Sequence, residues 1–150
     1  MTTTTVHASA VLIGARAALI RGPSGAGKSR LALELLQAAQ AGILPFARLV
    51  ADDRAHLEAV GARLLVRPAA PLAGLIEVRG AGLLRLDHEA RAVVGFVVDL
   101  AAVDAERLPQ TGAQNAEISG VSLPRLAVAA GAAALPTVLA YITSPADRWS

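Results

Sequence analysis

Cysteine is absent from this 150-residue sequence, which excludes disulfide bonds and thiolate chemistry and favours a cytoplasmic protein. Aromatic residues are scarce at 3%, whereas hydrophobic residues make up 54% and are largely alanine and other aliphatic types. The length suits one domain with a sizeable core. We therefore expect a single domain whose core is packed with small aliphatic side chains.

Lysine is almost absent as well. The chain holds fourteen lysine and arginine residues, and Lys28 is the only lysine among them. A compact ammonium on a flexible stem differs chemically from a planar guanidinium. This one exception to arginine therefore indicates a chemical requirement at position 28.

Strong charge and uninterrupted apolar runs are also missing. The net charge is +2 and no basic run carries interleaved aromatic residues, so we expect no nucleic-acid partner. Residues 1–6 are polar and lack the charged start of a signal peptide, and we predict a disordered tail there. Residues 126–146 carry no charge, but they are rich in alanine and glycine and interrupted by Pro136 and Pro145. We predict a buried end of the fold there, and no membrane span.

The single lysine lies in a G-x-x-x-x-G-K-S pattern, with an apolar strand before it and a leucine-containing helix after it. Glycines let the backbone approach phosphate oxygens, and free N–H groups and the helix dipole add positive potential. The pattern predicts a nucleotide-binding P-loop made of Gly22, Pro23, Ser24, Gly25, Ala26, Gly27, Lys28 and Ser29. In such a loop Lys28 reaches the β- and γ-phosphates and the Ser29 hydroxyl binds Mg²⁺. The structural alternative is a glycine-rich turn that merely caps a helix.

Apolar runs and turn residues predict many strands and few helices. Short turns at Gly14 and Gly61 predict two hairpins, and Gly42 with Pro45 ends the predicted helix. The predicted elements are strands at 10–13 and 17–21, a helix at 28–40, a strand at 48–53, strands at 54–60 and 63–67, a loop at 68–71, a strand at 75–82, a strand pair at 83–86 and 92–100, and a loop-rich segment at 101–115. This order favours an α/β fold with a mixed, partly antiparallel sheet and few helices. It differs from the alternating βαβα order of most P-loop proteins.

Two adjacent aspartates, Asp52 and Asp53, end the strand predicted at 48–53. A P-loop protein places its second carboxylate there, close to the metal and the nucleophile. Adjacent side chains at a strand end point to opposite sides, so only one of the two can face the site squarely. A hydroxyl and one carboxylate suit Mg²⁺, which keeps several waters. The structural alternative is an Asx-type turn between strands.

The order of these motifs resembles the HPr kinase/phosphorylase family of bacterial protein-serine kinases, related in fold to phosphoenolpyruvate carboxykinase. His7 is followed by the P-loop, by Leu49-Val50-Ala51-Asp52-Asp53 and by Ile76-Glu77-Val78-Arg79-Gly80-Ala81-Gly82. The resemblance covers residues 7–86 well, and the acidic pair followed by E-x-R-G-x-G is more specific than the P-loop. It implies a P-loop kinase fold of the HPr kinase and phosphoenolpyruvate carboxykinase-like type. It also implies one catalytic domain over 7–150, without the N-terminal domain of full-length members.

The resemblance also implies roles for the acidic residues. Asp53 would be the base that takes the proton from the substrate serine, and Asp52 would assist near the metal. Ser29 and Glu77 would hold Mg²⁺. Taken alone, Glu77 could simply face solvent from an apolar strand.

Further catalytic roles follow from the same resemblance. Lys28 would neutralise the migrating phosphoryl group and His7 would help to position the reacting groups. Arg107, in Glu106-Arg107-Leu108, would be the mobile arginine that touches the transferred phosphoryl group. Arg79 and the glycines after it would shape the floor of the site. The alternative for Arg107 is a solvated loop arginine.

The chain departs from the family near its C-terminus. The family carries P-V-x-x-G-R-N, tied to its dephosphorylating activity, where this sequence has Val128-Ala129-Ala130-Gly131-Ala132 without the arginine. The loop at Asp87-His88-Glu89 is also shortened. The kinase reaction is therefore predicted, and the phosphorylase reaction is in doubt.

The resemblance thus implies an ATP- and Mg²⁺-dependent protein-serine kinase acting on HPr or an HPr-like phosphocarrier, and a homo-oligomer. Two alternatives remain, a nucleotide-binding regulatory module and a small-molecule P-loop kinase. A GTPase is excluded because its N-K-x-D motif would need a second lysine. A small-molecule kinase usually carries lid arginines on a helical insertion, and none is obvious in the sequence.

Overall fold

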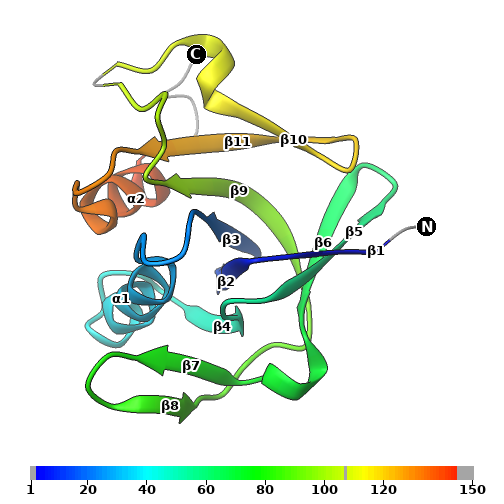
Figure 1. Cartoon of the computed structure of the whole chain (residues 1–150), viewed down its shortest axis with the longest axis vertical. Coiled ribbons are helices and arrows are strands. Elements are labelled where there is room, and N and C mark those ends of the chain that lie inside the picture. Colours follow the sequence, from blue (N-terminus) through cyan, green and yellow to red (C-terminus); the bar gives the residue numbers. More distant parts are fainter. Residues whose placement is uncertain (1–2, 107, 145–150) are drawn as a thin grey trace.

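The computed structural model describes residues 3–106 and 108–144 (Figure 1). Most of its elements are strands. In chain order they are β1 (Thr3–Val6), β2 (Ala8–Ile13), β3 (Arg16–Arg21), α1 (Lys28–Gln40), β4 (Ala47–Ala51), β5 (Ala55–Val60), β6 (Arg63–Pro68), a 3₁₀ turn (Ala70–Leu72), β7 (Leu75–Val78), β8 (Gly82–Arg85), β9 (Ala92–Leu100), a second 3₁₀ turn (Thr111–Gln114), β10 (Asn115–Ile118), β11 (Val121–Val128) and α2 (Ala134–Thr143).

A nine-stranded mixed sheet organises the fold. Its main path is β1-β5-β6-β9-β3-β2-β4, and the β10–β11 hairpin joins it through β9. β9 pairs antiparallel with β6 near its start and parallel with β3 and β11 toward its end. Together with the two α-helices of the described residues, this confirms the predicted α/β class with a mixed, partly antiparallel sheet and few helices.

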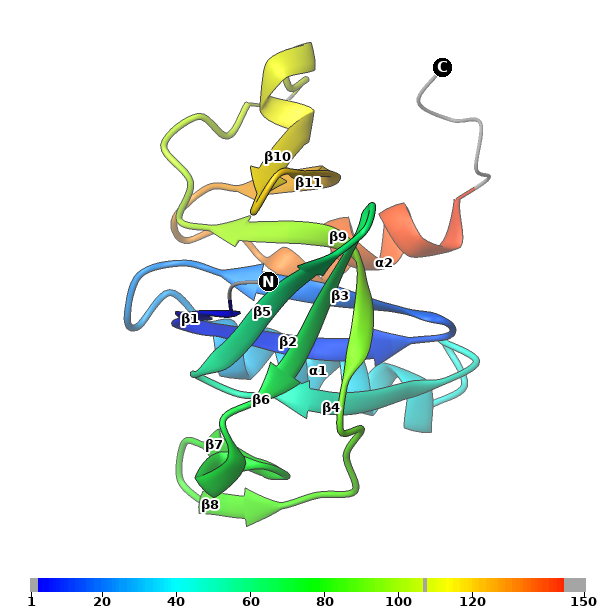
Figure 2. The same cartoon turned by 90° about the vertical axis from the view of Figure 1, so that its right-hand side faces the viewer.

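The core forms on both faces of this sheet because strand side chains alternate between them. Helices α1 and α2 lie on one side of β2, β3 and β9, and the β1–β5–β6 ribbon covers the other side (Figure 1). Figure 2 shows β5 and β6 crossing in front of β2 and β3. Helix α1 buries Leu31, Ala32, Leu35 and Ala38, a spacing that places one stripe of the helix on the sheet.

Small side chains fill much of the core, as the composition predicts. Ala8, Ala10, Ala17, Ala18 and Ala32 all have no exposed surface. Alanine at these positions lets neighbouring elements approach closely. The predicted core of small aliphatic residues is therefore confirmed.

The N-terminal segment differs from the prediction of a disordered tail. Residues 3–6 form β1, which pairs antiparallel with β5 from Thr3 opposite Glu58 to Val6 opposite Ala55. Threonine and valine are β-branched and favour extended backbone, and β5 provides partners that lie 49 to 55 residues away in sequence. The prediction is wrong for residues 3–6, and residues 1–2 lie outside the described part.

A second difference concerns strand pairing after residue 75. The hairpins β2–β3 and β5–β6 and the bounds of α1 match the predictions. The predicted pair 83–86 with 92–100 does not form, because β8 pairs with β7 and β9 enters the main sheet. A tight turn at Gly80 and Gly82, with φ of 85° and 88°, closes the β7–β8 hairpin.

The uncharged C-terminal stretch is only partly buried. Val128 at the end of β11 and Val138 in α2 are buried, while α2 exposes much of its remaining surface. Among the residues that the structure describes, no helix is long and apolar enough to cross a membrane.

One edge of the sheet collects the segments that carry the predicted site. Strands β3, β4, β9 and β11 run in the same direction and end there, and the antiparallel β2 begins there. In mixed and parallel α/β sheets, ligands bind outside the carboxyl ends of the strands. The register sets Ala8 opposite Arg21 and Arg21 opposite Asp99 at this edge.

Candidate active site

The P-loop connects β3 to α1 in the predicted way. Gly25 and Gly27 have φ of 83° and 102°, which favours glycine. A Cβ at either position would meet no atom within 4 Å, so the backbone conformation and not crowding requires glycine. The first turn of α1 holds no acidic residue, and Gly27 offers no side-chain cap. The N–H groups and dipole of α1 are thus directed at the loop.

Lys28 is a buried cation without a counter-charge. Its residue is 9% exposed, and Nζ donates to the carbonyl oxygens of Gly22 at 2.9 Å and Pro23 at 3.2 Å. No carboxylate of the described residues lies within ion-pair distance of it. Burying an unpaired charge is costly, so this arrangement suits an anionic ligand.

Asp52 is the corresponding buried anion, 6% exposed. Its Oδ1 accepts hydrogen bonds from the hydroxyls of Ser9 and Ser29, both at 2.7 Å. Its Oδ2 accepts from Ser29 at 2.9 Å and from the backbone N–H of Glu77 at 3.1 Å. Within the described part of the chain it forms no ion pair. Among the described residues, hydrogen bonds from neutral hydroxyl and N–H groups alone stabilise this carboxylate.

The Ser29 and Asp52 pair fits Mg²⁺. The hydroxyl proton of Ser29 is directed at Asp52, so the lone pairs on Oγ are left for a cation. A buried carboxylate without a positive partner provides the charge that such an ion requires. The described residues form no cluster of three or more His, Cys, Asp and Glu side chains that could hold a metal. A Mg²⁺ ion at this position would take few ligands from the protein and the others from phosphate and water, which is its usual arrangement.

Asp53 differs from Asp52 in its exposure and in its backbone conformation. Its side chain is exposed, and its φ is 66°, a conformation that Asp tolerates better than most residues. Its backbone N–H donates to Ser9 Oγ at 3.4 Å. The two carboxylates thus lie in different environments, and the exposed one is accessible to a second substrate. Strand alternation does not cause this difference, because β4 ends at Ala51 and Asp53 has a left-handed backbone.

The other predicted site residues form fewer hydrogen bonds in the site than Lys28, Ser29 and Asp52 do. His7 is exposed at the bend between β1 and β2, two residues before Ser9. Glu77 is exposed in β7, and its backbone contacts Asp52. Metal binding by the Glu77 carboxylate and positioning by His7 stay predictions. Arg107 lies outside the described residues.

Ser9 is the site residue that the sequence analysis missed. It is fully buried in β2 between Ala8 and Ala10, and it hydrogen-bonds to Asp52 and to the N–H of Asp53. It therefore joins the two acidic residues. The available signal was a lone hydroxyl in an otherwise apolar strand next to the P-loop strand.

An arginine network adjoins the P-loop on the same edge. Arg21, the residue before Gly22, forms two hydrogen bonds to Asp99 at 2.7 and 2.8 Å. Arg125 binds Asp99 at 2.5 Å, Asp104 at 2.9 Å through two nitrogens, and the carbonyl of Ala113 at 2.9 Å. These bonds connect the ends of β3, β9 and β11 to the segment after β9.

In this network the hydrogen bonds and opposite charges shift the pKa values of their partners against the effect of burial. Burial alone would raise the pKa of Asp99, but hydrogen bonds and charge from Arg21 and Arg125 outweigh it and lower the pKa. The hydrogen bond from Arg125 likewise lowers the pKa of the exposed Asp104. Asp104 and Asp99 together raise the pKa of Arg125 against the effect of its burial. The network therefore holds its charges in the ionised form.

Comparisons with known proteins agree with this geometry. A family model described as the HPr Serine kinase C-terminal domain matches residues 1–139. The HPr kinase/phosphorylase of Streptococcus pneumoniae strain Hungary19A-6 is 35% identical over 136 residues, covering 83% of this chain and 42% of the relative. That of strain R6 is equally similar, with 41% of its length covered. The chain thus spans less than half the length of these relatives.

A solved structure, the HPr(Ser) kinase/phosphatase from Coxiella burnetii, superposes with a TM-score of 0.71. The sequences are 21% identical, and the match covers 93% of each chain. At this identity the likeness establishes the fold. The predicted P-loop kinase fold of this type is confirmed.

Proposed function

Because the chain belongs to the HPr Serine kinase C-terminal domain family, we propose that it transfers the γ-phosphoryl group of ATP to a serine of HPr or an HPr-like phosphocarrier. The relatives named HPr kinase/phosphorylase are more than twice as long, so activity, substrate and partner of this chain are part of the proposal. A cytoplasmic location and a homo-oligomeric state are included in it.

The observation that carries the proposal is a pair of buried, opposite charges that no described residue neutralises. Lys28 and Asp52 are 9% and 6% exposed, and both lack an ion-pair partner within the described residues. Ser29, next to Lys28 in α1, hydrogen-bonds to Asp52 and so joins the two groups. A magnesium nucleotide carries both complementary charges, anionic phosphates for Lys28 and a cation for Asp52.

In the proposed reaction the chain supplies positions and charges. Lys28 and the P-loop backbone bind the β- and γ-phosphates, and Ser29 with Asp52 and Glu77 would hold the metal. Mg²⁺, when bound, neutralises charge on the phosphates. His7 and Arg107 would position the reacting groups and the phosphoryl oxygens.

The transfer step is a displacement at the γ-phosphorus. The serine oxygen of the acceptor forms a bond to phosphorus while the bond from phosphorus to the bridging β–γ oxygen breaks and ADP leaves. The exposed carboxylate of Asp53 takes the serine proton. Its accessibility supports this role, because an acceptor protein must bring its hydroxyl to the surface of the chain.

The reverse, phosphorolytic direction is in doubt. It must bind inorganic phosphate beside an anionic phosphoserine, and at an effective dielectric near 20 two unit charges 4 Å apart repel by about 4 kcal/mol. The connection from β11 to α2, residues 129–133, is exposed and uncharged. It offers no cation to offset that repulsion.

A transfer assay tests the proposal. The purified chain is incubated with labelled ATP, Mg²⁺ and the HPr-like carrier of the same organism, and the modified residue is mapped by mass spectrometry. We expect one phosphoserine on the carrier. Tight ATP binding without transfer would support the regulatory module instead, and label on a small molecule would support the small-molecule kinase.

A further inference from the structure

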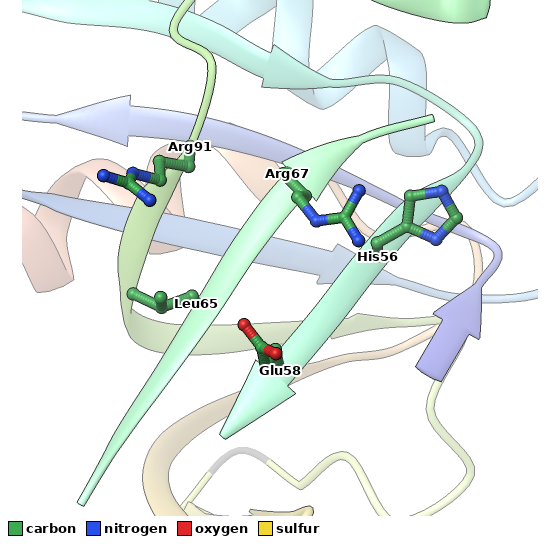
Figure 3. A pocket seen from close by; sticks show the side chains of 5 residues that line it. All are labelled: His56, Glu58, Leu65, Arg67 and Arg91. Carbon is green, nitrogen blue, oxygen red and sulfur yellow. The ribbon is translucent and has the colours of Figure 1, made fainter. Parts of the chain in front are cut away.

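The outward face of the β5–β6 hairpin carries a shallow depression of about 90 Å³ (Figure 3). Alternation along the two strands sends Leu57, Leu64 and Val66 into the core and their neighbours outward. The depression is lined by His56, Glu58, Leu65, Arg67 and Arg91. Figure 3 shows Arg67 beside His56, whereas Arg91 lies on the opposite side of Arg67 from His56, on the same side as Leu65. Arg91 directly precedes β9.

The depression carries an excess of positive charge. Neither Arg67 nor Arg91 takes part in any ion pair or hydrogen bond found in the described residues, unlike Arg21, Arg48 and Arg125 elsewhere. Glu58 is the one carboxylate in the lining and pairs with neither arginine within 4.0 Å. Two unpaired guanidinium groups beside one apolar side chain, Leu65, suit a carboxylate, which Arg binds through two parallel hydrogen bonds.

The depression is also close to the proposed catalytic base. His56 follows Asp53 by three residues, so an extended chain separates their backbones by at most about 11 Å. A typical protein interface covers about 800 Å² on each partner, which corresponds to a circle of about 16 Å radius. A protein that presents a hydroxyl group to Asp53 therefore has the area to reach this depression, which a small acceptor lacks.

We propose that this depression is a docking subsite for a carboxylate side chain of the protein acceptor, an Asp or Glu close to the acceptor serine. The inference rests on the proposed function and deepens it by stating the chemistry of the partner surface. Arg67 and Arg91 bind the carboxylate, and Leu65 contacts its methylene groups. Glu58 remains at the edge and disfavours partners with two adjacent carboxylates.

A double charge reversal, Arg67→Glu with Arg91→Glu, tests the proposal. Arg63→Glu is the matched control, because Arg63 is exposed on the same face of β6 but lies at its far end. Binding of the HPr-like carrier is measured by calorimetry, and transfer kinetics are measured in parallel. We expect KM and Kd for the carrier to rise about tenfold in the double variant, with kcat and ATP affinity within about twofold of wild type. The control should stay within about twofold on every measure.

Salt provides a second readout. Carrier binding by the wild-type chain should weaken between low and physiological ionic strength, and that dependence should be flatter in the double variant. Unchanged carrier binding in the double variant, or an equal loss in Arg63→Glu, overturns the docking subsite while leaving the proposed function standing. A wild-type chain that neither binds nor phosphorylates the carrier overturns both. A changed oligomeric state in the double variant would assign this face to contacts between copies and also overturn the subsite.

Discussion

Two groups of charges lie at the same edge of the sheet and are organised in opposite ways. In the arginine network every described charge has partners: Arg21 and Arg125 bind Asp99, and Arg125 also binds Asp104. At the P-loop, Lys28 and Asp52 are buried with hydrogen bonds alone. The paired group connects strands, whereas the unpaired group has charge to offer a ligand. We therefore expect ion pairing, and not burial alone, to distinguish the structural charges of this chain from its functional ones.

The comparison predicts different responses to mutation. Removing a member of the unpaired group should abolish chemistry at little cost to folding, because no ion pair is broken. Removing a member of the paired group should destabilise the fold, because it leaves another charge buried without its partner. Lys28→Ala and Arg125→Met test this contrast directly. Asp53→Asn and Ser9→Ala test the neighbouring site residues, and the four are given from the largest expected effect to the smallest.

Asp53→Asn is expected to have the largest effect. An amide cannot accept the serine proton, and loss of a general base typically lowers the rate by about 10²–10⁴. Affinity for the magnesium nucleotide should persist, since the exposed Asp53 side chain forms no hydrogen bond or ion pair with the P-loop among the described residues. Transfer to the carrier and nucleotide binding are measured together. Asp87→Asn, at another exposed aspartate, is the control, and a variant Asp53→Asn with a tenth or more of wild-type activity would remove the base role from this residue.

Lys28→Ala should follow closely. Losing one electrostatic contact to the migrating phosphoryl group lowers the rate by about 10²–10³, while backbone N–H groups still bind the phosphates. Thermal stability should be unchanged or higher, because an unpaired buried cation is removed. The control is Arg30→Ala, an exposed residue in the same helix that pairs only with Glu34. A large drop in melting temperature for Lys28→Ala would break the comparison.

Arg125→Met should act on the fold. It removes the hydrogen bonds to Asp99, Asp104 and Ala113 and leaves Asp99 with Arg21 alone. We expect a loss of about 2 kcal/mol in the free energy of unfolding, below the 3–5 kcal/mol of a fully buried pair because Asp104 is exposed. Urea unfolding at neutral pH measures it. Wild-type stability in this variant would show that the network does not connect the strands energetically.

The stability of Arg125→Met should also depend on pH in a different way from that of the wild type. The folded pKa of Asp99 lies below its ordinary value of 3.8, so its stabilisation is complete well above that value. As pH falls below about 4, the unfolded chain takes up the proton first and stability is lost. In Arg125→Met the pKa of Asp99 is lowered less, so acidification from pH 5 to 3 should cost this variant less than wild type. Unfolding curves at those two pH values measure the difference.

Ser9→Ala should have the smallest effect; Ser9 carries no charge and belongs to neither group, but its hydroxyl donates to the unpaired Asp52. The substitution removes one donor to Asp52 and the acceptor for the N–H of Asp53, with an expected cost of about 1 kcal/mol in stability. Because both acidic residues lose a positioning contact, kcat should fall about fivefold with KM for ATP unchanged. Ser122→Ala, an exposed serine in β11, is the control. A change in KM alone would argue against a role in positioning.

Much of the fold was predictable from sequence because it depends on neighbours in the chain. The P-loop, α1 and the hairpins β2–β3 and β5–β6 follow from local periodicity and turn residues. Two predictions were wrong, a disordered 3–6 and a pairing of 83–86 with 92–100. The first failed because the partner of β1 is β5, which is distant in the chain, and local patterns carry no information about such a partner. The second failed because the turn at Gly80 and Gly82 falls inside the strand predicted at 75–82, so β8 folds back on β7 and β9 joins the main sheet.

The site residues were likewise predictable where they belong to local motifs and not where their partners are distant in sequence. Lys28, Ser29, Asp52 and Asp53 belong to contiguous motifs, and the structure brings the Ser29 hydroxyl within hydrogen-bond distance of Asp52. Ser9 escaped detection because its partner Asp52 is 43 residues away. The network around Arg125 escaped for the same reason, since Asp99 is 26 residues away and a lone arginine carries no motif.

The position of β9 has a consequence for the order in which the chain is made. β9 separates β6 from β3, pairing Val94 with Ala17, which was synthesised 77 residues earlier. When Asp53 has just emerged from the ribosome this strand has not, and at 5–20 residues per second about 2–10 s pass before residue 100 emerges as well. During that interval the P-loop has no completed sheet edge to hold it. We expect nucleotide to bind only after the middle strand of the sheet has emerged, so that the ribosome sets the earliest moment at which the site exists.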